Sequence, residues 1–177
     1  GLKFATPKEG DNIIYTSLWD NYPESVTVPL KGSARAAYLL MAGSTNHMQC
    51  RIENANIKVQ YTDGSEEVLV IENPINWRPI HMDYYVDEYA FKTTAVQPYR
   101  VIFSTGQVSR KVDMSFGAAS ENDMKSTTLK PTDRIIPGGA AQILKIKLDP
   151  DKELQSLTLT TVANEVVIGL MGITLEK

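Results

Sequence analysis

The run of apolar residues from Ala36 to Ala42 constrains the fold of this chain more than any other segment. It reads AAYLLMA, without alternation of polar and apolar side chains, and it lies between Gly32 and Gly43. Alanine, leucine and methionine also suit a helix, but the two glycines leave too little room for one of typical length. A short apolar run bounded by glycines is typical of a β-strand that is covered on both faces. The segment therefore predicts a central strand in a β-sheet core.

Alternating polar and apolar residues predict further strands on both sides of this run. Val26, Val28 and Leu30, for example, recur at the period of two that a strand with one buried face requires. A second apolar run without alternation, from Val166 to Leu175, closes the chain. The strands expected from these patterns cover residues 13–15, 25–30, 36–42, 57–61, 68–71, 99–103, 111–116, 144–148, 157–161 and 166–175.

Turn signals separate these strands. The tetrad Thr62-Asp63-Gly64-Ser65 stands between two β-rich runs, and Asp-Gly in that position is a strong hairpin signal. Asp149-Pro150-Asp151 and Asn164-Glu165 mark two more turns. Because several strands alternate with turns and no segment has the pattern of an amphipathic helix, we predict an all-β, antiparallel β-sandwich.

The 177 residues fit a single domain, which at this size buries about 70% of the surface that its unfolded chain exposes. Residues 1–18 are expected to form an irregular N-terminal arm, and residues 104–139 a long polar connection. An unstructured connection of that length is uncommon in a compact domain, so we expect a short strand within it. The chain begins Gly1-Leu2-Lys3, without an initiator methionine or a signal peptide, and we interpret it as a domain excised from a larger protein.

Charge and composition exclude some classes of partner. The formal net charge is −3, whereas a nucleic-acid-binding domain presents a basic face. No apolar run approaches the roughly 20 residues of a membrane-spanning helix. Cys50 is the only cysteine, so the chain has no internal disulfide and no cysteine cluster for a metal. We therefore expect neither nucleic acid nor a membrane span among its interactions.

The order of the sequence motifs resembles that of a known class of module. The motifs are Val28-Pro29-Leu30, the strand from Tyr38 to Ser44, the hairpin from Tyr61 to Ser65, the segment from Asn76 to Ile80 and the strand from Ile168 to Leu175. Together they resemble the galactose-binding-domain-like jelly rolls attached to bacterial glycoside hydrolases. The chain is also similar to a family of unassigned function in polysaccharide-processing proteins of gut anaerobes. The resemblance covers residues 19–76 and 142–175, whereas residues 104–134 match nothing in it.

This resemblance implies an antiparallel jelly-roll sandwich, export to the periplasm or cell surface of a Gram-negative bacterium, and a carbohydrate-related function. Some relatives hold a structural calcium ion through a loop carboxylate and backbone carbonyls, but no residue of this chain can be matched to that ligand set. Calcium therefore stays unassigned, and no other cofactor is expected.

The residue types that carry catalysis do not form a recognisable constellation. His47 and His81 are the only imidazoles, and each is read more simply as a structural histidine than as a base. Cys50 opens a strand without a histidine at a useful spacing, which indicates a packed thiol. The acidic residues within 83–88 fit a solvated loop as well as a glycosidase carboxylate pair. A hydrolase must lower its activation barrier by at least about 8 kcal/mol, which requires several preorganised groups. Because the sequence shows no such group of residues, we expect no catalysis from this chain.

Aromatic residues in two loops suit carbohydrate binding better. Two aromatic faces that each cover about 100 Å² of sugar contribute roughly 5 kcal/mol, and millimolar to micromolar binding requires roughly 4 to 8 kcal/mol. The same rings also suit packing against a sheet or docking onto a neighbouring domain, because aromatic residues and arginine are enriched at interfaces. The candidate ligand-binding residues are Trp19, Tyr22, Trp77, Arg78, His81, Asp83 and Tyr84, with Tyr85 beside them.

The sequence thus favours a non-catalytic, carbohydrate-associated module of a larger exported polysaccharide-processing protein, which binds glycan through edge loops. The alternative is a structural module that packs against a neighbouring catalytic domain of the same chain and binds no free ligand. The exposure of Trp19, Trp77 and Tyr84 distinguishes the two hypotheses. Exposed rings beside a groove favour a sugar, and an apolar patch of several hundred Å² favours a partner domain.

Overall fold

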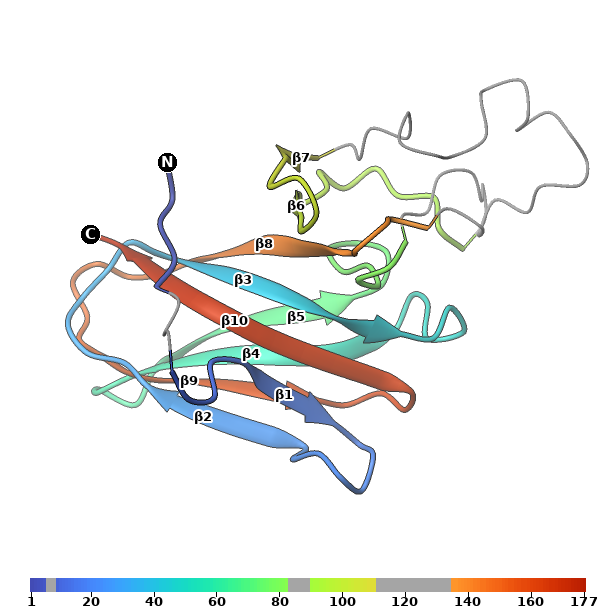
Figure 1. Ribbon diagram of the computed structural model, residues 1–177. Coiled ribbons are helices and arrows are strands. Elements are labelled where there is room, and N and C mark those ends of the chain that lie inside the picture. Colours follow the sequence, from blue (N-terminus) through green and yellow to red (C-terminus); the bar gives the residue numbers. More distant parts are fainter. Residues whose placement is uncertain (6–8, 83–89, 111–134) are drawn as a thin grey trace, which may run out of the picture.

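The computed structural model describes residues 1–5, 9–82, 90–110 and 135–177, which form a β-sandwich without a helix (Figure 1). Two antiparallel sheets form its layers, so the predicted all-β antiparallel sandwich is confirmed. The strands are β1 (Ile14–Ser17), β2 (Ser25–Pro29), β3 (Ala36–Thr45), β4 (Glu53–Tyr61), β5 (Glu66–Glu72), β6 (Tyr99–Ile102), β7 (Val108–Ser109), β8 (Ala140–Lys147), β9 (Leu154–Thr161) and β10 (Val166–Glu176).

The strands of the described residues pair in a nested order. The larger sheet has the order β1-β10-β3-β8-β6-β7, and the four-stranded sheet has the order β2-β9-β4-β5. β1 pairs with β10, β2 with β9, β3 with β8, and β4 with β5. The chain is therefore arranged as one long hairpin folded over into two layers, and the β6–β7 hairpin is inserted between β5 and β8.

β3 occupies the centre of the larger sheet, where it pairs with β10 on one side and with β8 on the other. Leu39 and Met41 are fully buried in the core between the sheets. Ala36 and Ala42, at alternate positions and so on the opposite face, are buried as well. The prediction of a central strand is therefore confirmed, but the strand is fully covered on its inner face only, because Tyr38 and Leu40 on the outer face are half-buried and Ser44 is exposed.

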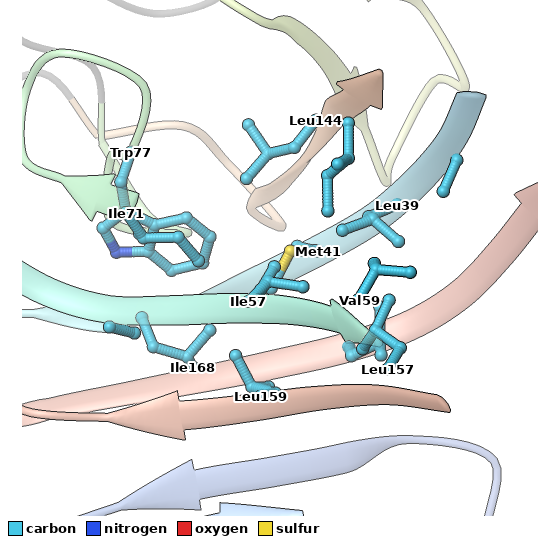
Figure 2. Close-up of a cluster of buried hydrophobic side chains, with 14 of the residues drawn as sticks. Leu39, Met41, Ile57, Val59, Ile71, Trp77, Leu144, Leu157, Leu159 and Ile168 are labelled. Atoms are coloured by element: carbon cyan, nitrogen blue, oxygen red, sulfur yellow. The ribbon is translucent and has the colours of Figure 1, made fainter. Parts of the chain in front are cut away.

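Side chains from both sheets form one hydrophobic core (Figure 2). Leu39 and Met41 of the larger sheet lie opposite Ile57 and Leu157 of the four-stranded sheet. Each large aliphatic side chain buried in this way stabilises the fold by about 1.5–3 kcal/mol relative to an exposed one. The alternation of apolar residues in the sequence supplies these contacts directly.

The predicted hairpin between β4 and β5 is present with the expected turn. The N–H of Tyr61 donates to the C=O of Ser65 at 2.9 Å, and Gly64 takes a φ of +84° that suits glycine best. The carboxylate of Asp63 accepts the N–H of Ser65 at 2.8 Å and lies 3.2 Å from Lys152 Nζ. Gly64 therefore provides the backbone conformation of the turn, and Asp63 provides both the hydrogen-bond acceptor for Ser65 and the negative charge near Lys152.

Two segments without clear sequence patterns contain short strands. β1 lies within residues 1–18, where a strand at 13–15 was expected, and it extends the larger sheet beside β10. β7 lies within the long polar connection of residues 104–139 and pairs with β6. The strand expected at residues 111–116 lies outside the described residues.

Candidate functional site

The two segments that carry the described candidate ligand-binding residues, the β1–β2 loop and the segment after β5, lie at one end of the sandwich, on the right in Figure 1. Ser17 at the end of β1 pairs with Val167 at the start of β10, and Thr45 at the end of β3 pairs with Val166. The β1–β2 loop and the segment that follows β5 therefore emerge at the same end.

The β1–β2 loop holds Trp19 on a hydrogen-bonded backbone. The N–H of Tyr22 donates to the C=O of Trp19 at 3.0 Å, and the N–H of Ser17 donates to the C=O of Pro23 at 3.1 Å. The N–H of Trp19 donates to the hydroxyl of Ser17 at 3.3 Å. Trp19 is nevertheless 49% exposed. Its indole can therefore meet a ligand without the loop having to become ordered first.

Tyr15 enlarges this region, although it was not among the candidate residues. Tyr15 is an exposed residue of β1, and its ring lies edge-on to that of Tyr22, with centroids 6.5 Å apart at 66°. Gly169 of the neighbouring strand gives the Tyr15 ring room, because a Cβ there would lie 2.7 Å from Tyr15 Cε1. No sequence pattern indicated the outward direction of Tyr15, because Ile13, Ile14 and Tyr15 are consecutive apolar residues. We call Tyr15, Trp19 and Tyr22 the aromatic surface.

Trp77 is a core side chain. Its residue is 0% exposed, and its Nε1–H donates to Thr45 Oγ1 at 2.6 Å. Figure 2 shows the indole beside Ile71 at one end of the hydrophobic cluster. Gly43 lies against the ring, since a Cβ at that position would come within 2.9 Å of Trp77 Cζ2. The ring therefore has no face open to a sugar, and Trp77 is not part of the aromatic surface.

The polar candidates near Trp77 have different surroundings. Arg78 is half-buried, and its C=O accepts a hydrogen bond from Gln142 Nε2 at 3.1 Å. His81 is exposed and stays a candidate for contact with a ligand. Asp83 and Tyr84, together with Tyr85, lie outside the described residues. Of this loop, only His81 is thus placed on the surface by the structure.

Two of the groups weighed above for catalysis, His47 and Cys50, are packed by neighbouring residues. Nε2 of His47 contacts Sδ of Met82. Burial, and to a lesser degree the charge of His81, lower the pKa of His47 below its ordinary value of 6.5. The thiol of Cys50 donates to the C=O of Ala90 at 3.1 Å. A packed imidazole that favours its neutral form and a hydrogen-bonded thiol are typical of structural side chains.

A buried arginine that the sequence analysis did not single out fixes the segment between Pro79 and Met82. The guanidinium of Arg100 donates to the C=O groups of Pro79 and Met82 at 2.9 Å each, and to that of Ala140 at 3.2 Å. Arg100 is 1% exposed. Because hydrogen bonds to charged groups are stronger than neutral ones, Arg100 joins this segment firmly to β6 and β8.

A largely apolar groove opens on the side of the sandwich next to the end of β6. It has a volume of about 840 Å³ and borders both sheets, with Leu40 and Ile143 from the larger sheet and Leu69 from β5. At its rim the guanidinium carbon of Arg110 lies 4.3 Å from the ring centroid of Tyr99, in a cation–π contact. The groove is a second candidate binding region, which no sequence motif indicated.

The described residues offer two observations on cofactors and membranes. No group of three or more histidine, cysteine, aspartate or glutamate side chains there is arranged to hold a metal ion. The described part of the chain also contains no helix of the length and apolarity that crossing a bilayer requires.

Comparisons with protein-family models, with curated proteins and with solved structures found no match for this chain. The arguments for its function therefore come from the fold, the aromatic surface and the groove.

Proposed function

We propose that this chain is a non-catalytic, carbohydrate-associated module of a larger exported polysaccharide-processing protein, and that it binds glycan through the aromatic surface. The observation that carries the proposal is the exposed indole of Trp19 on a hydrogen-bonded loop that also carries Tyr22, whose ring contacts that of Tyr15. The motif resemblance to modules of bacterial glycoside hydrolases supports a setting in the periplasm or on the cell surface of a Gram-negative bacterium.

We also assign the sandwich to the jelly-roll class within this proposal. A jelly roll consists of two Greek keys that place eight strands in two sheets. Without the β6–β7 hairpin, β1-β10-β3-β8 faces β2-β9-β4-β5, and the first strand pairs with the last, the second with the next to last, and so on inward. This nested order supports the jelly-roll assignment. The fold presents connecting loops at the ends of the sandwich, where binding residues commonly lie.

The aromatic surface has the chemistry that a sugar ring requires. An indole that covers about 100 Å² of sugar C–H surface contributes about 2.5 kcal/mol, and a second ring raises this to about 5 kcal/mol. The exposed side chains of Asp20 and Asn21 lie in the same loop and supply hydrogen-bonding groups for hydroxyls. These contributions predict dissociation constants in the micromolar to millimolar range.

A calorimetric glycan screen with matched variants tests this proposal. The chain is titrated with plant and host polysaccharides, and those that bind are tested again with Trp19→Ala, which should weaken binding tenfold or more. Phe103→Ala is the control, because Phe103 is a comparably exposed aromatic residue next to β6 and should not affect binding. Absence of binding to every polysaccharide, or equal binding by Trp19→Ala, would contradict the proposal.

The groove favours a second candidate function, in which the chain packs against a neighbouring catalytic domain and binds no free ligand. Its wall includes Leu40, Val101 and Ile143, which lie on the outer face of the larger sheet. Apolar surface in such a position often marks contact with another domain. Val101→Asp should abolish association with that domain, supplied as a separate chain, and leave glycan binding by the aromatic surface unchanged.

A further inference from the structure

The two edges of the four-stranded sheet differ in their protection against added strands. At the β2 edge, the bonds from Leu30 N–H to Gln155 and from Thr161 N–H to Glu24 show that even-numbered residues of β2 face β9. Pro29 therefore stands where an N–H would point outward, and proline is a common protection of edge strands. β5, at the other edge, reads EEVLVIE and contains no proline.

The outer edge of β5 carries backbone groups that are ready to pair. Its register with β4 directs the backbone of the odd-numbered residues toward β4, so Glu66, Val68 and Val70 face outward. The side chain of Asn76 covers one end of this edge, where Nδ2 donates to the C=O of Val70 at 2.8 Å. Within the part of the chain that the structure describes, the N–H and C=O groups of Glu66 and Val68 have no hydrogen-bond partner.

Side chains on both faces of this edge suit an added strand. On the outer face, Val68 and Val70 are 52% and 42% exposed. On the inner face, Leu69 packs against the core and lines the groove together with Leu144 and Val96. A strand paired with β5 would therefore place alternate side chains along the groove. Strand addition obtains its affinity from such backbone bonds and its specificity from such side-chain contacts.

Charge distinguishes the possible occupants of the edge. β5 has no basic residue, and Glu66 and Glu67 are both exposed. A second copy of the chain that paired antiparallel through Glu66 and Val68 would set its own Glu67 directly opposite Glu67, which is unfavourable for like charges. A basic side chain at that place would instead be attracted. Like-charge repulsion thus disfavours self-pairing in this register, whereas the charge of Glu67 favours a foreign strand with a basic side chain.

We infer that the free edge of β5 accepts an extended strand of a partner polypeptide, with a basic side chain opposite Glu67 and an apolar side chain opposite Leu69. The two positions lie two residues apart on the same face of the partner strand. This inference goes beyond glycan binding and gives the occupant of the groove a chemical identity. It stands whether or not the aromatic surface binds a sugar.

Peptide titrations with three variants test the inference. The probe is a short capped peptide in which threonine alternates with leucine and a central lysine, and a second peptide has glutamate in place of the lysine. The lysine peptide should bind the unaltered chain saturably and at least tenfold more tightly than the glutamate peptide. Glu67→Lys should reverse this preference.

The other two variants are matched proline substitutions. Val68→Pro removes an outward N–H from the β5 edge, and Thr27→Pro removes one from the β2 edge of the same sheet, so neither breaks a backbone hydrogen bond to its neighbouring strand. Thr27→Pro also removes the exposed hydrogen bond between the hydroxyls of Thr27 and Thr158. Val68→Pro should weaken peptide binding tenfold or more, whereas Thr27→Pro should leave it unchanged.

Three results would overturn the inference. One is no saturable binding of the lysine peptide by the unaltered chain, and another is equal binding by Val68→Pro. The third is self-association that Val68→Pro abolishes while neither peptide binds, because it would identify a second copy as the occupant. Glycan binding is measured separately, so failure of the peptide titrations leaves the sugar proposal intact, and the reverse also holds.

Discussion

The indole N–H of Trp77 donates a hydrogen bond to the hydroxyl of Thr45 at 2.6 Å, and both residues are buried. This bond joins the segment after β5 to the end of β3 and closes one end of the core. A buried N–H that lacks an acceptor is unfavourable, so the bond fixes how the indole lies. The most conspicuous aromatic candidate in the sequence thus stabilises the fold.

Replacing Thr45 with valine should destabilise the protein by about 1–3 kcal/mol, because Thr45→Val keeps the shape of the side chain and leaves the Trp77 N–H without its acceptor. The free energy of unfolding in urea measures this loss. Thr27→Val is the control, since Thr27 is exposed and should change the free energy by about 0.5 kcal/mol or less. Equal stabilities of the two variants would show that the bond contributes nothing.

Gly43→Ala should destabilise the protein by at least about 1–3 kcal/mol. An added Cβ would lie 2.0 Å from the C=O oxygen of Val167 and 2.9 Å from Trp77 Cζ2, so both the β3–β10 pairing and the indole would have to move. Gly172→Ala, on the same sheet, would meet only the side chain of Phe4, at 3.2 Å. Urea unfolding should therefore show a smaller loss for Gly172→Ala, and the opposite ranking would contradict this packing.

The fold could be predicted from the sequence because strand formation here is a local property. The alternation in β4, β8 and β9, the apolar runs of β3 and β10 and the Asp63-Gly64 turn each specify their own structure. The nested pairing could not be read in this way. Pairing of β1 with β10 joins the two ends of the chain, and no pattern within either segment names its partner.

The binding residues were harder to predict, because exposure depends on tertiary contacts. Trp19 and Trp77 both stand among turn-forming residues in the sequence, yet one is half-exposed and the other fully buried. Gly43, which packs against the indole of Trp77, and Thr45, which accepts its hydrogen bond, lie more than thirty residues earlier in the chain. The groove likewise combines residues from both sheets, so no single segment could indicate it.

Acid should weaken the β4–β5 turn. Hydrogen bonds from Ser65, assisted by Lys152, lower the pKa of Asp63 from 3.8 to about 2. The folded state binds this proton less readily than the unfolded state. The contribution of Asp63 to the free energy of unfolding is therefore fully present above about pH 4 and is lost as the pH falls toward 2. Urea midpoints measured across this range should fall less steeply for Asp63→Asn than for the unaltered chain. Identical slopes would contradict the assignment.

The imidazole of His47 should titrate below its ordinary pKa of 6.5. Burial disfavours its charged form, and the charge of His81 adds to the effect. The folded state therefore binds this proton less readily, so His47 lowers stability as the pH falls below 6.5. Proton NMR titration of His47 measures the pKa directly. His81→Gln should raise it only in part, because burial is the larger cause, and a pKa at or above 6.5 would refute this account.

The indole N–H signals of Trp19 and Trp77 in an NMR titration with a bound polysaccharide test the central proposal most directly. The two signals are assigned with Trp19→Phe, and the buried Trp77 serves as an internal control in the same sample. Glycan binding through the aromatic surface predicts that the Trp19 signal shifts saturably while the Trp77 signal stays in place. A glycan that binds and leaves the Trp19 signal unmoved would contradict it.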